Sequence, residues 1–480
     1  MTDVKDAFVA FVDAGNGLLW GSVLIYLLIG AGLYFTIRMG FLQFRQFGHM
    51  FSLISSSRQG AEGGISSFQA FSTSLAARVG TGNMAGVAVA IYLGGPGAIF
   101  WMWITALVGM STSFIESTLA QAYKVNNGDS TFRGGPAYYI EKGLGQRWLG
   151  VLFALCLIVA FGIAFNGVQS NSIAAAMDNA FGFDHTLVGI LLAVAVAPII
   201  FGGMRSVARV AELIVPFMAL GYLIVAFYVV FANITQLPSV FATIVKSALG
   251  FEQAAGGAMG YAIAQAMMQG IKRGLFSNEA GMGSAPNAAA TATTDPNHPV
   301  AQGYVQMLGV FVDTIVICTA TAAIILLSGV MEPESGVTGI ALTQKALEVE
   351  VGSWGSGFVA IAILLFAFTS LIANYSYGES NIRYIFDSKL AINVYRVVVL
   401  GIIVVGAITD LPTVWAFADL SMGMMALINL VAILLLSNIV FALLKDYEEQ
   451  RKRGVTPSFD RKKFPQLDKQ IDKDVWNKHQ

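Results

Sequence analysis

Long apolar runs separated by short polar loops make up most of the chain. A helix needs about 20 apolar residues to cross a hydrocarbon core of about 30 Å. Two stretches near 235–250 and 337–350 are expected to be amphipathic or loop helices between spans. Eleven runs are long enough, and they predict spans at 18–38, 65–93, 97–122, 148–178, 186–204, 210–232, 254–285, 301–330, 353–377, 392–409 and 412–444. The expected fold class is an all-α polytopic membrane protein.

Lysines and arginines gather in alternate loops, which predicts the orientation. The intervening loops are poor in them; 331–352, for example, has four glutamates and one lysine. Because positive residues collect on the cytoplasmic side, the N-terminus is expected outside and the C-terminus inside. The tail from Lys445 holds 17 of the 57 charges and is expected to be solvated. The positive residues follow span one (Arg38, Arg45 and Arg58, against Glu62), three (Lys124, Arg133, Lys142, Arg147), five (Arg205, Arg209), seven (Lys272, Arg273) and nine (Arg383, Lys389, Arg396).

The second run is interrupted by Val79-Gly80-Thr81-Gly82-Asn83. Glycine weakens a helix interior by about 1 kcal/mol relative to alanine. Irregular backbone at membrane depth survives only where protein, water or a ligand satisfies its polar groups. The interruption therefore predicts a binding site in a broken helix. The alternative is that the small residues only allow tight helix packing.

A second interruption strengthens the binding-site interpretation. The seventh run contains Gly270-Ile271-Lys272-Arg273-Gly274 and then Gly281-Met282-Gly283. Two broken helices of opposite direction in corresponding positions are typical of inverted-repeat transporters. We expect residues 1–64 to hold one extra span, 65–232 and 233–444 to form the two five-helix repeats, and 445–480 to form a charged tail.

Composition excludes several other classes. Only 12% of residues are charged, against about 25% in soluble proteins. Cys156 and Cys318 lie in apolar runs and the four histidines are widely spaced, so no disulfide framework, zinc motif or haem pair is expected. Gly80–Gly86 lacks the spacing of a dinucleotide loop, and no Walker motif occurs. No catalytic residues, nucleic-acid partner or cleaved signal peptide are expected; a channel remains an alternative.

The first break offers two kinds of ligand. Where a half-helix ends its carbonyls lack partners, and where the next begins its N–H groups are free and carry a partial positive charge. Carbonyls of Ala76, Arg78 and Val79 could bind a cation. The N–H groups around Thr81, Gly82 and Asn83 could bind a carboxylate. Together they would suit cotransport of Na+ and a zwitterion.

Polar residues in two other spans could complete the site. In span four, Gln169 and Asn166 share a helix face, and in span nine Thr369-Ser370 is followed by Asn374. The hydroxyl pair could complete an oxygen shell for Na+ with the carbonyls of span two. Alternatively, these groups could tie helices together or bond to carbonyls of their own helix.

Ionisable residues inside spans are costly and are functional candidates. Arg78 lies beside the break, and we expect it to pair with Asp313 or Glu279. A structural role and a role in ion coupling both remain open for it. The other ionisable residues of this kind are Glu116 in span three, and Lys272, Arg273 and Glu279, which we expect nearer the inner surface.

Several motifs resemble the alanine or glycine:cation symporters, the sodium:alanine symporter family. The resemblance implies a LeuT-type fold with a 5+5 inverted repeat, in a bacterial-type plasma (inner) membrane. It also implies Na+-driven transport of small neutral amino acids. The motifs span most of the membrane region: VGTGNMAGVAVAI from Val79, LGGPGAIFWMW from Leu93, GGPAYYIEKGLG from Gly134, KRGLFSNEAGMGSAPNAAA from Lys272 and FVDTIVICT from Phe311.

The resemblance also assigns roles. It implies substrate contacts at Thr81, Gly82 and Gln169, and Na+ ligands at Thr369 and Ser370 with the carbonyls of Ala76 and Val79. Asn83 and the backbone around Gly270 complete the expected substrate site. The fixed charge of Arg78 could replace one Na+. Asp313 is its candidate partner.

The chain departs from the family at two positions. Members that favour alanine often have tryptophan where this chain has Gln269 and Asn374. The shorter amides predict a roomier, more polar pocket. A polar substrate such as glutamine is therefore an alternative to alanine and glycine, and a proton-coupled carrier is another. Stoichiometry and oligomeric state stay open.

Overall fold

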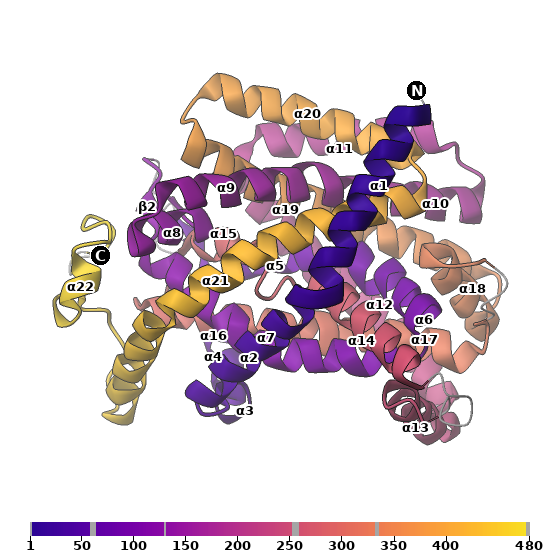
Figure 1. The fold of residues 1–480 in the computed structure, drawn as a ribbon, viewed down its shortest axis with the longest axis horizontal. Coiled ribbons are helices and arrows are strands. Elements are labelled where there is room, and N and C mark those ends of the chain that lie inside the picture. Colours follow the sequence, from indigo (N-terminus) through magenta and orange to yellow (C-terminus); the bar gives the residue numbers. More distant parts are fainter. Residues whose placement is uncertain (1, 58–63, 129–130, 252–258, 332–335, 477–480) are drawn as a thin grey trace.

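The structure is a computed structural model that describes residues 2–57, 64–128, 131–251, 259–331 and 336–476 (Figure 1). Within them, eight helices are long and apolar enough to cross a membrane, and two shorter apolar helices cover Gly82–Gly94 and His185–Phe201. The described parts of the predicted spans are helical apart from short breaks and turns, but the predicted number of eleven is not tested. Residues 254–258 of the seventh predicted span lie outside the described residues.

The first predicted span is longer than expected. It forms one continuous helix from α1 (Thr2–Leu18) through a π-helical turn (Leu19–Val23) into α2 (Leu24–Arg38). The start predicted at residue 18 is wrong because α1 packs along α21 (Leu411–Lys452). Val12 is buried there, and the Asn16 Nδ2 donates to the Ala416 carbonyl at 2.9 Å.

The remaining elements follow in two groups. The first group is α3 (Leu42–Arg45), α4 (Phe47–Ser56), β1 (Ile65–Ser66), α5 (Ser67–Arg78), α6 (Val87–Gly94), α7 (Gly97–Ala122), β2 (Val125–Asn126), β3 (Phe132–Arg133), α8 (Pro136–Leu144), α9 (Arg147–Leu157), α10 (Asn166–Phe181), α11 (His185–Phe201) and α12 (Gly203–Ala232). The second is α13 (Leu237–Ala248), α14 (Met259–Asn278), α15 (Ala285–Ala289), β4 (Ala292–Thr293), α16 (Pro299–Val310), α17 (Thr319–Ser328), α18 (Gly339–Val351), α19 (Trp354–Ile385), α20 (Lys389–Ile408) and α22 (Pro465–Asp468). Short 3-10 turns cover Ile234–Gln236 and Arg461–Lys463. The helices α13 and α18 agree with the two loop helices expected between spans.

Within the described parts of the spans, π-helical segments lie at four places. Besides Leu19–Val23, they cover Gly82–Gly86 before α6, Ile158–Phe165 between α9 and α10, and Phe311–Cys318 between α16 and α17. Such segments are frequent at functional sites. Three of the four border the first break, which is described below.

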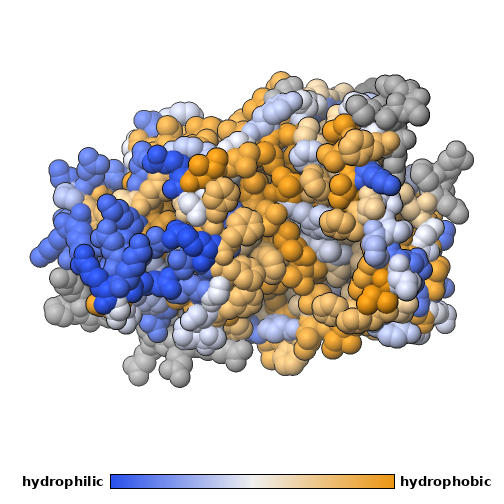
Figure 2. All heavy atoms as spheres, turned by 90° about the horizontal axis from the view of Figure 1, so that it is seen from below, coloured by the Kyte–Doolittle hydropathy of each residue, from blue (hydrophilic) through white to orange (hydrophobic). Residues whose placement is uncertain are grey.

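Helices α7, α9, α11 and α20 run roughly along the long axis of the molecule, whereas α1–α2 and α21 cross it obliquely (Figure 1). One end carries α8, the β2–β3 hairpin and α22, and is called here the C-terminal face. The opposite face carries α13 and α18. Figure 2 shows a broad apolar surface between the ends and a hydrophilic surface over the C-terminal face. This banding is what a protein that crosses a bilayer requires.

Two broken helices occupy the centre. The first is α5, a break at residues 79–81, and the π-helical segment leading into α6. The second is α14, a break at residues 279–284, and α15. They pack together and against α7, α16 and α19. Strand β1 precedes α5 and β4 follows α15; the two pair in parallel, Ile65 with Ala292 and Ser66 with Thr293.

One of the two predicted breaks in span seven is wrong. Helix α14 runs through Gly270–Gly274 without interruption, whereas the break predicted near Gly281–Gly283 is confirmed. In the uninterrupted helix, Lys272 and Arg273 lie between the break and the face that carries α13 and α18. There both contact the Asp419 carboxylate of α21, at 3.0 Å for Lys272. They do not form the positive loop that we expected at the inner surface.

The charged tail was predicted to be solvated, but its apolar residues pack against the rest of the protein. Phe459, Leu467, Ile471, Val475 and Trp476 are each at most 6% exposed. The Trp476 Nε1 donates to the Ala122 carbonyl at 3.3 Å, at the end of α7. The amide of Phe459 donates to the Asn297 carbonyl at 2.9 Å. These apolar residues recur between the charges, so the tail buries one side while its charges stay in water.

Candidate functional site

The first break is fully buried, and side chains satisfy its backbone amides. The Gly80 amide donates to the Asn83 Oδ1 at 2.9 Å, and the Thr81 amide donates to the Gln169 Oε1 of α10 at 2.9 Å. A Cβ on Gly80 would lie 2.8 Å from that Gln169 oxygen and closer still to the Ser370 Oγ of α19. Glycine is therefore required where α10 and α19 meet the broken backbone.

The end of α5 meets one of the two predicted hydroxyls. The Ser370 Oγ donates to the Ala76 carbonyl oxygen at 2.8 Å. Val79 still continues the helix, since its amide donates to the carbonyl four residues earlier at 2.7 Å. Thr369 instead donates to a carbonyl of its own helix at 2.9 Å and contacts the Met218 sulfur of α12 at 3.7 Å. The structure brings Ser370 to the break and turns Thr369 toward α12.

Amide side chains of α10 and α19 form one wall. The Asn374 Nδ2 donates to the Asn166 Oδ1 at 3.2 Å. The Asn374 Oδ1 and the Thr81 Oγ1 are buried and have no hydrogen-bond partner among the described residues. Buried polar groups are normally paired, so both atoms are available to a ligand. Gln169, Asn166 and Asn374 thus line the region where the sequence predicts substrate contacts.

Asp313 joins the two broken helices. The Asn83 Nδ2 donates to the Asp313 Oδ1 at 2.6 Å, and the Ser277 Oγ of α14 donates to Oδ2 at 2.9 Å. Thr314 donates to the same Oδ2 at 2.7 Å. Beside this network, Gly82 packs against the backbone of Ser277. Sequence reasoning missed Ser277, which nothing distinguishes from the other serines of the chain.

The pairing predicted for Arg78 is wrong. Its Nη1 donates to the Gln306 carbonyl at 3.1 Å and its Nη2 to the Ser113 Oγ at 3.2 Å. Neither Asp313 nor Glu279 forms an ion pair with it in the part of the chain described. The reason is that each carboxylate has nearer hydroxyl donors, which are Ser277 and Thr314 for Asp313 and Ser284 for Glu279. Arg78 instead ties α5 to α7 and α16.

A buried carboxylate organises the second break. Glu116 of α7 accepts hydrogen bonds from the amides of Gly281 and Gly283, both at 3.2 Å, and from the Asn429 Nδ2 at 2.9 Å. Glu279 turns the chain there with a φ of 59°. From the sequence, Glu116 was predicted to be an ionisable residue inside a span, but its hydrogen-bond partners could not be predicted.

Gln269 and Gly270 do not reach the first break. They lie in intact α14, seven to eight residues before Ser277, hence about 11–12 Å along the helix. Gly270 packs directly on the backbone of Ala98, and the Gln269 Cβ lies close to Gly94. The predicted substrate role of these two residues is not supported by their position. The glycine serves close packing of α14 on α7.

An aromatic layer missed by sequence reasoning covers the break on the opposite-face side. Phe165 stacks on Phe276 with ring centroids 4.3 Å apart, and Phe276 lies 4.7 Å from Trp415. The Arg273 guanidinium lies 4.4 Å from the Trp415 ring, and its Nη2 contacts the Asp419 Oδ1 at 2.6 Å. Only the three-dimensional packing brings these residues from three separate helices together.

Comparison with solved structures identifies the fold. MhsT in complex with L-phenylalanine matches with a TM-score of 0.55 and 12% identity, over 76% of this chain and 87% of that one. A manganese transporter of Eremococcus coleocola, in a mutant form, matches with a TM-score of 0.52 and 17% identity, over 79% of this chain and 81% of that one. At such identities the likeness concerns the fold alone, which is the predicted LeuT-type fold.

Curated relatives are far more similar in sequence. The "Probable sodium/glutamine symporter GlnT" of Bacillus subtilis (strain 168) is 56% identical, over 93% of this chain and 92% of its own length. The "Amino-acid carrier protein AlsT" of the same organism is 54% identical, over 97% of each chain. The "Sodium/alanine symporter AgcS" of Methanococcus maripaludis is 40% identical, over 93% of this chain and 98% of its own length.

These findings agree on a multi-pass membrane transporter. The family and the fold are those of transporters rather than enzymes. The sequence profile described as "Sodium:alanine symporter family" matches residues 5–461. The protein belongs to the sodium:alanine symporter family.

Proposed function

We propose that the protein is a Na+-coupled symporter of small neutral amino acids, with alanine and glycine as its first candidate substrates. The contact between Ser370 and Ala76 is the observation that carries this proposal. The hydroxyl lies 2.8 Å from a carbonyl oxygen at the end of α5, where helix carbonyls lose their intrahelical partners. Oxygen ligands suit a hard cation. Na+ would bind between Ala76, Val79 and Ser370, with Thr369 joining after a change of rotamer.

The substrate would bind on the other side of the break. Its carboxylate replaces the Gln169 Oε1 at the Thr81 amide and takes the unpaired Thr81 hydroxyl as a further donor. The released Gln169 side chain then contacts the ammonium group, and Gly82 and Asn83 complete the cradle. Ion and substrate thereby order the same short segment, which gives a physical basis for coupling their binding.

Alternating access would require a gate on each side of this segment. On the opposite face, the aromatic layer and the Arg273–Asp419 ion pair close the path. On the C-terminal face, the β1–β4 pair holds the half-helices α5 and α15 together. The alternation of positive loops favours a cytoplasmic C-terminal face and an external N-terminus.

Glutamine is the second candidate substrate. The buried Asn374 Oδ1 has no partner among the described residues, and it could accept a hydrogen bond from a side-chain amide. The relative named as a probable sodium/glutamine symporter is 56% identical to this chain. Asn374→Trp should fill this space and reduce competition by glutamine while alanine competition persists. Unchanged glutamine competition would contradict this assignment.

Counterflow in proteoliposomes tests the function itself. Labelled alanine, glycine and glutamine should each be assayed with and without a Na+ gradient at fixed pH. Saturable counterflow that requires Na+, together with uptake driven by a Na+ gradient, supports the proposal. Uptake driven by a pH gradient alone would indicate a proton-coupled carrier, and flux without saturation or counterflow would indicate a channel.

A matched pair of substitutions tests the ion site. Ser370→Ala removes the hydroxyl beside Ala76 and should raise the Na+ concentration for half-maximal transport. Ser376→Ala is the control on the same helix, because among the described residues the Ser376 hydroxyl donates to a carbonyl of α19, at 2.7 Å, and to no other group. Equal Na+ dependence of the two variants would remove Ser370 from the ion site.

A further inference from the structure

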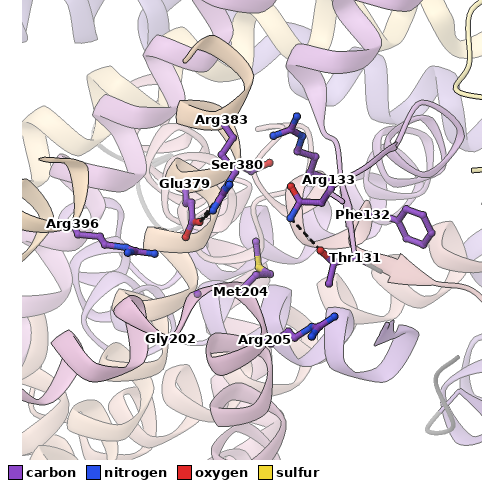
Figure 3. A pocket seen from close by; sticks show the side chains of 12 residues that line it. Thr131, Phe132, Arg133, Gly202, Met204, Arg205, Glu379, Ser380, Arg383 and Arg396 are labelled. Carbon is purple, nitrogen blue, oxygen red and sulfur yellow. Dashed lines mark hydrogen bonds and ion pairs between the residues drawn. The ribbon is translucent and has the colours of Figure 1, made fainter. Parts of the chain in front are cut away.

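A cavity on the C-terminal face lies outside the site described above. Its volume is about 150 Å³, well above the roughly 10–15 Å³ that one water molecule needs. Figure 3 shows its lining, which comes from the β2–β3 hairpin, the junction of α11 with α12, the end of α19 and the start of α20. Four arginines lie around it: Arg133, Arg205, Arg383 and Arg396.

The arginines of this cavity outnumber its carboxylates. Glu379 is the carboxylate of the lining, and Arg383 binds it through Nε and Nη2, at 3.0 and 2.7 Å. Arg133 contacts the Asp387 carboxylate at 3.5 Å. Among the described residues, Arg133, Arg383 and Arg396 face two carboxylates, Glu379 and Asp387, which leaves a net charge of +1. Like charges held in a partly buried space repel one another, so the cavity favours an anion and disfavours a passing Na+.

Several guanidinium donors remain for such an anion. The Arg133 Nε is buried and has no hydrogen-bond partner among the described residues. Arg396 uses its Nε for the Tyr375 hydroxyl and its Nη1 for Asn393, which leaves Nη2. Arginine forks match the geometry of phosphate oxygens. Because the remaining donors come from two separate arginines, they suit an anion with several acceptor oxygens, and phosphate is such an anion.

The surroundings point to a lipid as the source of the phosphate. The Arg396 guanidinium lies 5.0 Å from the ring of Phe201, which is 51% exposed. Along α20, Leu390, Val394 and Val397 are likewise exposed. The cavity thus lies beside the exposed apolar side chains of α11 and α20. Basic pockets between helices at this depth suit the headgroups of anionic lipids.

We propose that this cavity binds the phosphate of an anionic phospholipid, with the acyl chains lying along the exposed faces of α11 and α20. The site is independent of the transport site at the first break. The proposal therefore stands or falls separately from the proposed function.

Native mass spectrometry of the full chain with phosphatidylglycerol tests the proposal, with phosphatidylcholine for comparison. Phosphatidylglycerol should bind at least tenfold more tightly to the wild type than to the Arg133→Gln/Arg396→Gln variant. Arg147→Gln is the control, since Arg147 is exposed on the same face and pairs with Glu141 outside the cavity. Equal binding by all three proteins would overturn the proposal.

A second variant leaves every arginine in place. Met204 lies within the cavity in Figure 3, so Met204→Glu adds a carboxylate there and Met204→Gln is its uncharged control. Only the carboxylate should weaken phosphatidylglycerol binding. Inorganic phosphate should displace the lipid only at large excess. Phosphate that competes as well as phosphatidylglycerol, mole for mole, would show a soluble anion to be the occupant and would overturn the lipid assignment.

Discussion

The contact of Gly80 with α10 and α19 is so close that one methyl group should disrupt the transport site. In Gly80→Ala, the new Cβ would lie 2.8 Å from the Gln169 Oε1 and would overlap the Ser370 Oγ. Overpacking a well-packed interior costs about 1–3 kcal/mol. Losing the hydrogen bond from the Thr81 amide to Gln169 adds about 1 kcal/mol.

The sum of roughly 2–4 kcal/mol corresponds to about 30- to 700-fold in an equilibrium constant. We expect the half-saturating Na+ and substrate concentrations in proteoliposome counterflow to rise by a factor within this range. Gly86→Ala is the matched control, because a Cβ there meets its nearest side-chain atom, on Trp415, at 3.5 Å. That is an ordinary contact, so transport by Gly86→Ala should equal that of the wild type.

A double variant separates steric effects from loss of the ion ligand. In Gly80→Ala/Ser370→Ala the overlapping hydroxyl is gone, and the nearest remaining Ser370 atom is its Cβ, at 3.2 Å. The thermal midpoint should recover toward that of the wild type while Na+ affinity stays low. Wild-type kinetics for Gly80→Ala alone would refute the reasoning, since the break would then not be held by α10 and α19.

Three further predictions concern other parts of the molecule. Glu116→Gln should lower the thermal midpoint by several degrees, because a single amide oxygen cannot accept hydrogen bonds from both Gly281 and Gly283. Each hydrogen bond to a charged group contributes about 1.5–3 kcal/mol. Glu141→Gln removes an exposed ion pair and should leave the midpoint unchanged. Deleting residues 454–480 should lower the thermal midpoint by uncovering the surface beneath Trp476; a midpoint equal to that of the wild type would mean that the tail packing contributes nothing. Burial lowers the pKa of Lys124, just beyond the end of α7, from 10.5 to about 7. Between pH 7 and 10.5 the unfolded chain therefore holds the proton that the folded chain has lost, so the midpoint should rise with pH in this window and stay flatter in Lys124→Met, as measured by fluorescence-detected melting.

Hydropathy and the positions of helix-breaking glycines predicted the helical regions of the spans, the two loop helices and both broken helices. These features depend on local composition, because a helix in lipid must satisfy its own backbone. The break predicted at Gly270–Gly274 is wrong because it, too, was predicted from local composition alone. A glycine that interrupts a helix and a glycine that admits a neighbouring helix look alike in one sequence, and only the presence of Ala98 against Gly270 distinguishes them.

Long-range partners were beyond the sequence. Nothing near Arg78 distinguishes Asp313 from the carbonyl of Gln306 as its acceptor, and hydroxyls far along the chain decided the outcome. The prediction for the tail was wrong because its charged residues dominate its mean hydropathy, whereas its few large apolar residues are the ones that pack. Ser370 and Gln169 were predicted at the break because they are polar residues in otherwise apolar spans and because the family resemblance assigned them roles there.

The parallel pairing of β1 with β4 has a consequence for biogenesis. It joins residues more than two hundred positions apart, and α5, which leads from it, buries Arg78 and several serines and is too short and polar to cross lipid alone. While the ribosome is still making the first half of the chain, α5 has neither its strand partner nor the carbonyl of Gln306 that Arg78 needs. The first half-helix therefore reaches its final position only after α15 and α16 have emerged, and assembly of the transport site is a late step in membrane insertion.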